Sequence, residues 1–313
     1  MTDNNKPHPN MIFGYRGLAQ AWECDLMGHL NVSHYFGRSS DQAFFMRHAL
    51  GLSPSYLAAE KRGTVALQEH VRFHREVPAG GLMIGRSAPV DINQRTMTVC
   101  QEFRDSDDNL LTCFKTVIGF FDLQARKLLP WPEATLEKAE KMRIDLPDYA
   151  APKYLPASGK PDDTTRAQSA AQGFVRLGAT GINSWECDQF GHMNTMFYVR
   201  RLTEAVPHFW HYAGIDLKQS LSAKRGFAVG EICVNYVGEL CEGEMVETWT
   251  AMRQVNEKTA QFEHRLFNVE TGALAAQVTA ITVHFDLETR RATAWSDALR
   301  AKLQAVTIGL DGD

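Results

Sequence analysis

The sequence predicts an α+β protein that contains two copies of one domain, and three observations lead to this prediction. At 313 residues, the chain is longer than most single domains. Its second half repeats the residue pattern of the first half in the same order. Each half contains one stretch with helical periodicity, followed by short runs of β-branched and aromatic residues that are typical of strands.

The repeat is clearest in one short motif. Trp22-Glu23-Cys24-Asp25 recurs as Trp185-Glu186-Cys187-Asp188, at an offset of 163. The same offset relates the residues that follow: Gly28-His29, Asn31 and Tyr35 match Gly191-His192, Asn194 and Tyr198. Two long copies indicate a duplicated domain that packs as a pseudo-dimer, and we place the copies at residues 11–145 and 173–306.

The segment between the copies differs from both in composition. Residues 146–172 contain several residues that interrupt regular structure, namely Pro152, Pro156, Ser158, Gly159 and Pro161. Such residues favour turns and extended connections over helices or central strands. We therefore interpret this segment as a linker between the two domains.

One long helix is predicted in each copy. After Asn194, apolar residues follow one another at spacings of four and three, which places them on one helix face: Tyr198, Leu202, Ala205, Phe209 and Tyr212. Gly214 is the predicted stop signal. Pro207 lies within this helix and removes a backbone donor, so we expect a kink or an early end there.

Strands are predicted downstream of the helix. In copy one, the β-branched and aromatic runs cover residues 64–73, 95–103 and 110–121. Turn-forming residues at 105–109, and at 269–272 in copy two, indicate antiparallel neighbours. One long helix against a curved antiparallel sheet is an α+β arrangement.

Composition excludes several classes of function. Hydrophobic residues make up 44% of the chain and charged residues 22%, as in ordinary globular proteins. A net charge of -4 gives no basis for a nucleic-acid partner. The six cysteines lack the spacing of a zinc site. Neither a signal peptide nor a membrane-spanning run is visible, so the expected location is the cytoplasm.

Asp25 and Asp188 are the candidate catalytic residues, because each stands just before the start of a predicted helix. Backbone N–H groups in the first helical turn have no intrahelical acceptor, so they can donate to an oxygen that gains negative charge. Gly28 and Gly191 would let a carbonyl group approach the backbone closely. A carboxylate beside such donors could attack the substrate directly, or it could activate a water molecule.

Simpler roles compete with this interpretation. An aspartate before a helix is commonly an N-cap, but both copies keep aspartate together with glycine, histidine and asparagine, which favours function. Asn31 and Asn194 are themselves alternative N-caps. His29 and His192 could be hydrogen-bonded core residues. Cys24 and Cys187 are expected to pack rather than to act as nucleophiles.

The repeated motif resembles that of the hotdog-fold thioesterases of the hydroxybenzoyl-CoA type, and of the plant acyl-ACP thioesterases. The resemblance covers both halves, at Asp25/His29/Asn31/Tyr35 and at Asp188/His192/Asn194/Tyr198. It implies two tandem hotdog folds, each a long central helix wrapped by a curved antiparallel sheet. It also implies an acyl-CoA or acyl-ACP thioesterase that uses no metal and no organic cofactor.

The resemblance also assigns roles to residues. The aspartate either attacks the thioester carbonyl, giving a mixed anhydride, or deprotonates water, while the histidine orients the carboxylate or the substrate. Glu76 and Glu239 match a glutamate of the plant enzymes, although either could be a solvated charge at a strand end. Gly28 and Gly191, with Asn31 and Asn194, would bind the substrate and its oxyanion. Met27 and Phe190 replace an asparagine of the plant enzymes.

Two basic pairs and two rival functions complete the expectations. Lys61-Arg62 and Lys224-Arg225 are candidates for binding the phosphates of coenzyme A, or else exposed loop charges. The rival functions are a hotdog enoyl-CoA hydratase and a non-catalytic acyl-CoA-binding protein. We expect the chain to form a homodimer.

Overall fold

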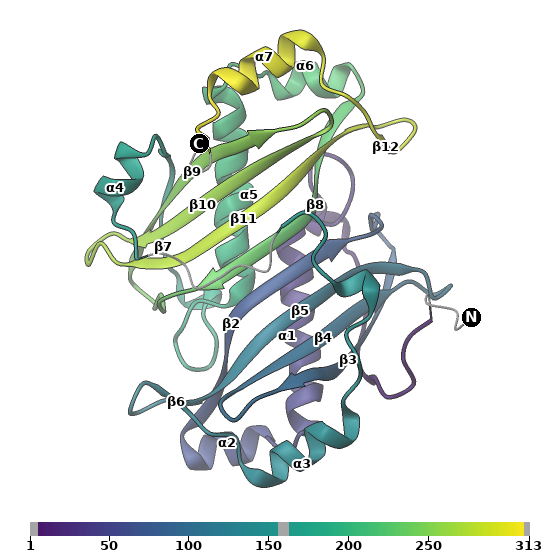
Figure 1. Cartoon of the computed structure of the whole chain (residues 1–313), viewed down its shortest axis with the longest axis vertical. Coiled ribbons are helices and arrows are strands. Elements are labelled where there is room, and N and C mark those ends of the chain that lie inside the picture. Colours follow the sequence, from purple (N-terminus) through teal and green to yellow (C-terminus); the bar gives the residue numbers. More distant parts are fainter. Residues whose placement is uncertain (1–5, 156–162, 310–313) are drawn as a thin grey trace. The chain divides into compact units, whose positions relative to one another are not determined.

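The computed structural model describes residues 6–155 and 163–309 (Figure 1). The chain divides into two compact units, Met1–Lys153 and Tyr154–Asp313, which we call unit 1 and unit 2. From the first strand of each unit to the helix that follows its last strand, the two units contain the same elements in the same order, as the internal repeat predicts.

Unit 1 contains an antiparallel sheet in which neighbouring strands follow the order β1-β3-β4-β5-β2, with β6 paired to the end of β5. The strands are β1 (Ile12–Leu18), β2 (Arg62–Phe73), β3 (Leu82–Ile92), β4 (Thr96–Arg104), β5 (Leu110–Asp122) and β6 (Lys127–Leu129).

Unit 2 repeats this topology as β7-β9-β10-β11-β8, with β12 paired to β11. Its strands are β7 (Val175–Gly181), β8 (Arg225–Tyr236), β9 (Met245–Val255), β10 (Thr259–Asn268), β11 (Leu274–Asp286) and β12 (Arg291–Ala292). In both units the strand that follows the long helix forms one end of this order, and the first strand forms the other.

Each unit has one helix of 18 residues, α1 (Val32–Ala49) in unit 1 and α5 (Thr195–Tyr212) in unit 2. The long helix packs against the first and third strands of its own unit and lies behind the sheet in the view of Figure 1. The shorter helices are α2 (Pro54–Glu60), α3 (Glu133–Met142), α4 (Arg166–Ala171), α6 (Leu217–Ser222) and α7 (Asp297–Ala305), with 3-10 turns η1 (Ala21–Glu23), η2 (Asp148–Ala150) and η3 (Ser184–Glu186).

The predicted end of the second long helix is confirmed, and of the two outcomes expected at Pro207, a kink or an early end, the early end is wrong. Gly214 follows the helix with φ +71, the left-handed conformation that glycine adopts most readily. Pro207 does not end α5, which continues to Tyr212. The turn after Pro207 carries Phe209 and Trp210, both buried in the core of unit 2, and this packing stabilises the helix beyond the missing hydrogen bond.

The three strands predicted in copy one are present as β2, β4 and β5, but the strand between the first two was not predicted. β3 contains Gly85, Pro89 and Asp91, which are unfavourable in strands. Its pairing with β4 shifts register between Pro89 and Asp91, so the proline sits at an irregularity that tolerates a missing donor. Tertiary pairing on both sides of β3 therefore overrides its weak strand propensity.

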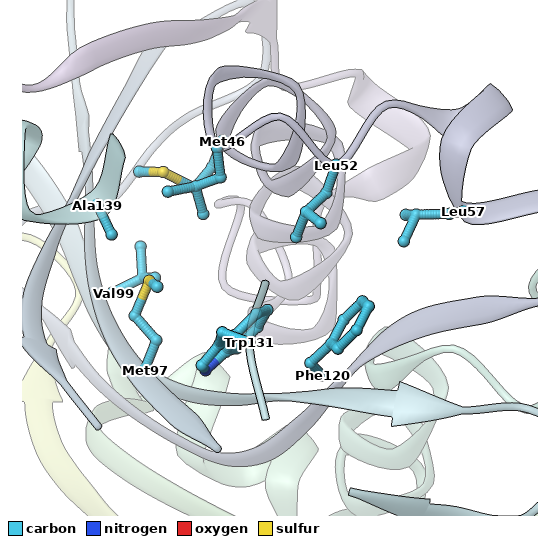
Figure 2. Packing of buried hydrophobic residues seen from close by; sticks show 9 residues of the cluster. Met46, Leu52, Leu57, Met97, Val99, Phe120, Trp131 and Ala139 are labelled. Carbon is cyan, nitrogen blue, oxygen red and sulfur yellow. The ribbon is translucent and has the colours of Figure 1, made fainter. Parts of the chain in front are cut away.

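The core of unit 1 lies between the end of α1 and the sheet. Met46 and Leu52 face Met97 and Phe120 across this layer, and Trp131 stacks on Phe120 with ring centroids 5.5 Å apart (Figure 2). These residues are almost fully buried. Burial of apolar side chains such as these is the dominant favourable term in folding.

The segment predicted as a linker contains two short elements, η2 and α4. Its beginning is fastened to unit 1, because Arg72 on β2 donates hydrogen bonds to the main-chain oxygens of Asp148, Tyr149 and Ala151. Residues 156–162, which include Pro156, Ser158, Gly159 and Pro161, lie outside the described residues. The boundaries 146–172 stay a prediction.

Within the described residues, no helix is long and apolar enough to cross a membrane.

Candidate active site

Asp25 lies in a tight loop between η1 and α1. The loop closes through two main-chain hydrogen bonds, from Asp25 N to the oxygen of His29 (2.9 Å) and from Gly28 N to the oxygen of Asp25 (3.0 Å). The carboxylate accepts a third from Met27 N at 2.8 Å. Gly28 has φ +82, and nothing would meet an added Cβ, so backbone conformation rather than space requires the glycine.

Unit 2 builds the same loop around Asp188. Asp188 N bonds to the oxygen of His192 at 2.8 Å, Gly191 N bonds to the oxygen of Asp188 at 3.0 Å, and Gly191 has φ +79. The residue after the aspartate is exposed in both loops, as Leu26 in unit 1 and Gln189 in unit 2. The two loops thus share a backbone but present different side chains to their surroundings.

Neither aspartate is a helix cap. The N-caps are Asn31, whose side chain accepts a hydrogen bond from Ser33 N at 3.0 Å, and Asn194, whose side chain accepts one from Met196 N at 3.0 Å. Asn31 and Asn194 are therefore the helix caps, which is the alternative that the sequence offered. The carboxylate of Asp25 is held by its own loop, and its side chain remains 28% exposed.

Glu76 reaches the same place from the loop between β2 and β3. That loop pairs with the end of the aspartate loop, through Leu30 N to the oxygen of Val77 (2.8 Å) and a bridge between His29 and Pro78. As a result, His29 lies between two carboxylates. Its Nδ1 is 3.5 Å from Asp25 Oδ2, and its Nε2 is 3.4 Å from Glu76 Oε1.

The corresponding residues also meet in unit 2, with different contacts. His192 Nδ1 is 3.8 Å from Glu239 Oε1. Asp188 Oδ1 accepts hydrogen bonds from Phe190 N (2.8 Å) and from the main-chain N of His192 (3.1 Å). Each unit therefore gathers an aspartate, a histidine and a glutamate from two loops at one end of the long helix.

The family model of the thioesterase-like superfamily matches the chain over residues 19–139 and 182–303. The chain belongs to this superfamily. The matched segments include both aspartate loops. No curated protein has a significant sequence similarity to the chain.

Solved thioesterase structures share the fold across nearly the whole chain. The 12:0-ACP thioesterase from Umbellularia californica has a TM-score of 0.68 at 12% identity, covering 91% of this chain and 100% of its own. The putative oleoyl thioesterase from Lactobacillus plantarum has a TM-score of 0.67 at 14% identity, covering 88% and 97%. The predicted pair of tandem hotdog folds is thereby confirmed.

Within this thioesterase-like fold, the glycine amides are not available in the way the sequence suggests. Gly28 N and Gly191 N each donate to the main-chain oxygen of the loop aspartate, closing the turn. An amide N–H that is already bonded inside the loop cannot also polarise a substrate carbonyl without rearrangement. In this conformation both amides are therefore used within the loop, and the oxyanion role of these two glycines stays a prediction.

The tyrosines of the motif belong to the core. Tyr35 and Tyr198 are buried on the long helices, where they pack edge-on against Phe73 and Tyr236 respectively, each with ring centroids 5.2 Å apart. Burial raises the pKa of both phenols. These tyrosines therefore stay protonated and contribute packing.

The two cysteines beside the aspartates are only partly buried, contrary to the expectation of a packing role in the interior. Cys24 Sγ lies 3.5 Å from the oxygen of Gln20, and Cys187 Sγ lies 3.6 Å from that of Asn183. Desolvation, with neighbouring carboxylates, raises the pKa of both thiols. A raised pKa disfavours the thiolate that a nucleophile requires.

The candidate phosphate-binding residues lie away from the carboxylates of their own unit. Arg62 starts β2 and pairs with Asp122 at 2.9 Å, and Arg225 starts β8 and pairs with Asp286 at 2.5 Å. Glu76 follows the opposite end of β2, which is about 35 Å away at the usual rise per residue. A phosphate contact by Lys61-Arg62 or Lys224-Arg225 is therefore unsupported within one unit.

Sequence reasoning overlooked one feature of the site. Glu23 and Glu186 are buried and bind arginines of the long helices, Arg38 and Arg201 respectively. The signal was present, because all four residues obey the offset of 163 and both glutamates belong to the repeated Trp-Glu-Cys-Asp motif.

Proposed function

We propose that the protein hydrolyses acyl thioesters of coenzyme A or of an acyl carrier protein, with Asp25 and Asp188 as the catalytic carboxylates. The observation that carries the proposal is the meeting of Asp25, His29 and Glu76 in one unit and of their counterparts in the other. Membership of the thioesterase-like superfamily supports the reaction class.

The carboxylate can act in two ways. As a nucleophile, an oxygen of Asp25 attacks the carbonyl carbon of the thioester, the C–S bond breaks, and the thiolate leaves and takes a proton. Water then hydrolyses the mixed anhydride and regenerates the aspartate. As a general base, Asp25 removes a proton from the water that attacks the thioester. Both routes give a free acid and a thiol.

The neighbouring groups fit supporting roles. His29 lies where it can orient the carboxylate of Asp25 and, when protonated, supply a proton to the leaving sulfur. We propose that the first amide of α1, rather than that of Gly28, polarises the thioester carbonyl. Val32 is the first helical residue, and within the described residues its N–H donates no hydrogen bond.

The proposed substrate is an acyl thioester, and experiments can identify its acyl group and its carrier. The similar structures include a 12:0-ACP thioesterase and a putative oleoyl thioesterase, which supports fatty acyl groups as the first to test. A panel that presents each acyl group on coenzyme A and on a carrier protein would identify the carrier. The cytoplasmic location and the homodimer stay predictions.

The decisive experiment removes the carboxylates. We expect Asp25→Asn with Asp188→Asn to lower thiol release by at least about 10³-fold, because amides neither attack nor accept the proton. The fold should persist, as shown by an unchanged circular dichroism spectrum. The single variants report whether one or both sites turn over.

Full turnover in the double variant would reject the assignment. The same assay tests the rival reaction, because a hydratase would consume the absorbance of an enoyl-CoA without releasing thiol. Binding of acyl-CoA with neither signal in the parent protein would favour the non-catalytic alternative.

A further inference from the structure

The two glutamates of the repeated motif are buried and form matching ion pairs with arginines, of which Arg201 is buried and Arg38 is partly buried. Glu23 is 4% exposed and Glu186 is 3% exposed. Arg38 Nη2 lies 2.6 Å from Glu23 Oε1, and Arg201 Nη2 lies 2.8 Å from Glu186 Oε2. Each glutamate stands two residues before a candidate catalytic aspartate, and each arginine belongs to the second turn of the long helix.

Each glutamate also holds both ends of the aspartate loop. The Glu23 carboxylate accepts a hydrogen bond from Gln20 N at 2.8 Å, and its main-chain oxygen accepts one from Asn31 N at 3.0 Å. Glu186 repeats these contacts with Asn183 N (3.0 Å) and Asn194 N (2.9 Å). One residue thus joins the 3-10 turn before the loop to the helix cap after it.

Stability alone is a poor explanation for these pairs. Taking two charges out of water costs much of what their attraction gains, so a buried ion pair is weak evidence for stabilisation. Nε of Arg38 and Nε of Arg201 are also buried without a hydrogen-bond partner in the described part of the chain. Burial raises the pKa of Glu186, but hydrogen bonds from Arg201 and Asn183 outweigh this and lower it overall, so Glu186 is ionised.

We propose that Glu23–Arg38 and Glu186–Arg201 are positioning pairs, which hold the aspartate loops so that Asp25 and Asp188 point at the thioester. This inference rests on the proposed function. Neither pair has to touch the substrate, because each acts through the loop. The other hydrogen bonds of the loop either close it on itself or join its end to the loop that carries Glu76, whereas the glutamate–arginine pair ties its beginning to the long helix. A displacement of about 1 Å in a catalytic group can cost about 100-fold in rate.

The test uses a chain with a single working site. In an Asp188→Asn background, Glu23→Gln should lower kcat about 10- to 100-fold while KM changes by less than about twofold, because orientation rather than binding is lost. In an Asp25→Asn background, Glu186→Gln should act in the same way. If only one site turns over, that site gives the measurement.

The matched control is another buried ion pair in unit 1. Glu102 and Arg104 on β4 are both fully buried, with Arg104 Nε 2.9 Å from Glu102 Oε1. Glu102→Gln removes a buried charge without touching the aspartate loop, so kcat should stay within about twofold of the parent even if the melting temperature falls. A loss of kcat equal to that of Glu23→Gln would overturn the positioning role.

A double variant keeps the inference testable if a single substitution in the pair impairs folding. Glu23→Gln with Arg38→Met removes both charges, so it should melt at a higher temperature than Arg38→Met alone. We expect kcat to stay low although stability recovers. Recovery of kcat together with the melting temperature would overturn the inference. An unchanged kcat in Glu23→Gln would reject the positioning pair alone, whereas an active Asp25→Asn/Asp188→Asn chain would reject the proposed function.

Discussion

The two aspartate loops share their backbone hydrogen bonds but differ in how the histidine meets its carboxylates. In unit 1, the ring of His29 approaches both Asp25 and Glu76. In unit 2, the ring of His192 approaches Glu239, and its main-chain N–H bonds to Asp188. The comparison teaches that the motif fixes the loop, whereas the contacts of the histidine ring vary with its surroundings.

The cores of the two units also differ, in the aromatic contacts of an equivalent tryptophan. In unit 1, Trp131 stacks on one aromatic ring, that of Phe120. In unit 2, the matching Trp295 stacks on His284 with centroids 4.5 Å apart and on Phe227 at 6.0 Å. Equivalent positions therefore support the same fold with different numbers of aromatic contacts.

The largest expected effect separates the two cores. Trp295→Ala should lower the free energy of unfolding by about 3–5 kcal/mol, because a large buried ring leaves a cavity. Trp131→Ala should cost about 1 kcal/mol less, since it loses one stacking partner rather than two. Urea unfolding followed by circular dichroism measures both. Equal losses would show that the additional stacking in unit 2 adds nothing.

The next effect compares the two histidines in single-site backgrounds. His29→Gln should lower kcat about 100-fold, within the range for a lost acid–base group, because the side chain makes the contact with Asp25. His192→Gln should cost less, because its ring lies farther from the glutamate: His192 Nδ1 is 3.8 Å from Glu239 Oε1, whereas His29 Nε2 is 3.4 Å from Glu76 Oε1. Thiol release at saturating substrate measures kcat for each variant. A larger loss of kcat at His192 than at His29 would contradict this prediction.

Acid should weaken unit 2 through a buried histidine. Burial lowers the pKa of His264 to about 3, whereas an unfolded histidine has a pKa of about 6.5. The unfolded chain therefore binds this proton first, so the stability from neutral His264 is present above about pH 6.5 and is lost as the pH falls toward about 3. Between pH 6.5 and pH 5 the loss is about 2 kcal/mol.

A variant tests the origin of this acid sensitivity. His264→Gln removes the titration but keeps a polar group near Thr250, whose Oγ1 lies 2.9 Å from Nδ1 of His264. The variant should lose less stability than the parent between pH 7 and pH 5 in urea titrations. Parallel losses in both proteins would place the acid sensitivity elsewhere, for example at His74 of unit 1, whose pKa burial lowers to about 4.

The smallest effect concerns the cysteines. Cys24→Ser and Cys187→Ser should each leave kcat within about twofold of the parent, because a thiol with a raised pKa is a poor nucleophile. The comparison should show no difference between the units. A loss of 100-fold or more in either variant would make the thiol, rather than the aspartate, the candidate nucleophile.

Much of the fold could be predicted because duplication supplies an internal comparison. Asp25 and Asp188 were identified from matching sequence contexts, and the long helix from the spacing of its apolar residues and from Gly214. The strand β3 was not predicted, since Pro89 and Asp91 within it are unfavourable locally and only pairing with its neighbours stabilises it.

The site was predicted less completely than the fold. Glu76 meets His29 only because two loops pair, and spacing along the sequence carries no record of that pairing. The bond between Gly28 N and its own loop, and the separation of Arg62 from Glu76 along β2, also depend on three-dimensional structure. Sequence patterns identified the residue types, and tertiary contacts determined their partners.

The residue after each aspartate shows what duplication within one gene permits. Leu26 is 76% exposed beside Asp25, while exposed Gln189 occupies the same place beside Asp188. In an assembly of identical subunits, a mutation at this position would alter every copy at once. Here the apolar and the polar versions are inherited together, so natural selection can adjust the approach to one carboxylate without disturbing the other.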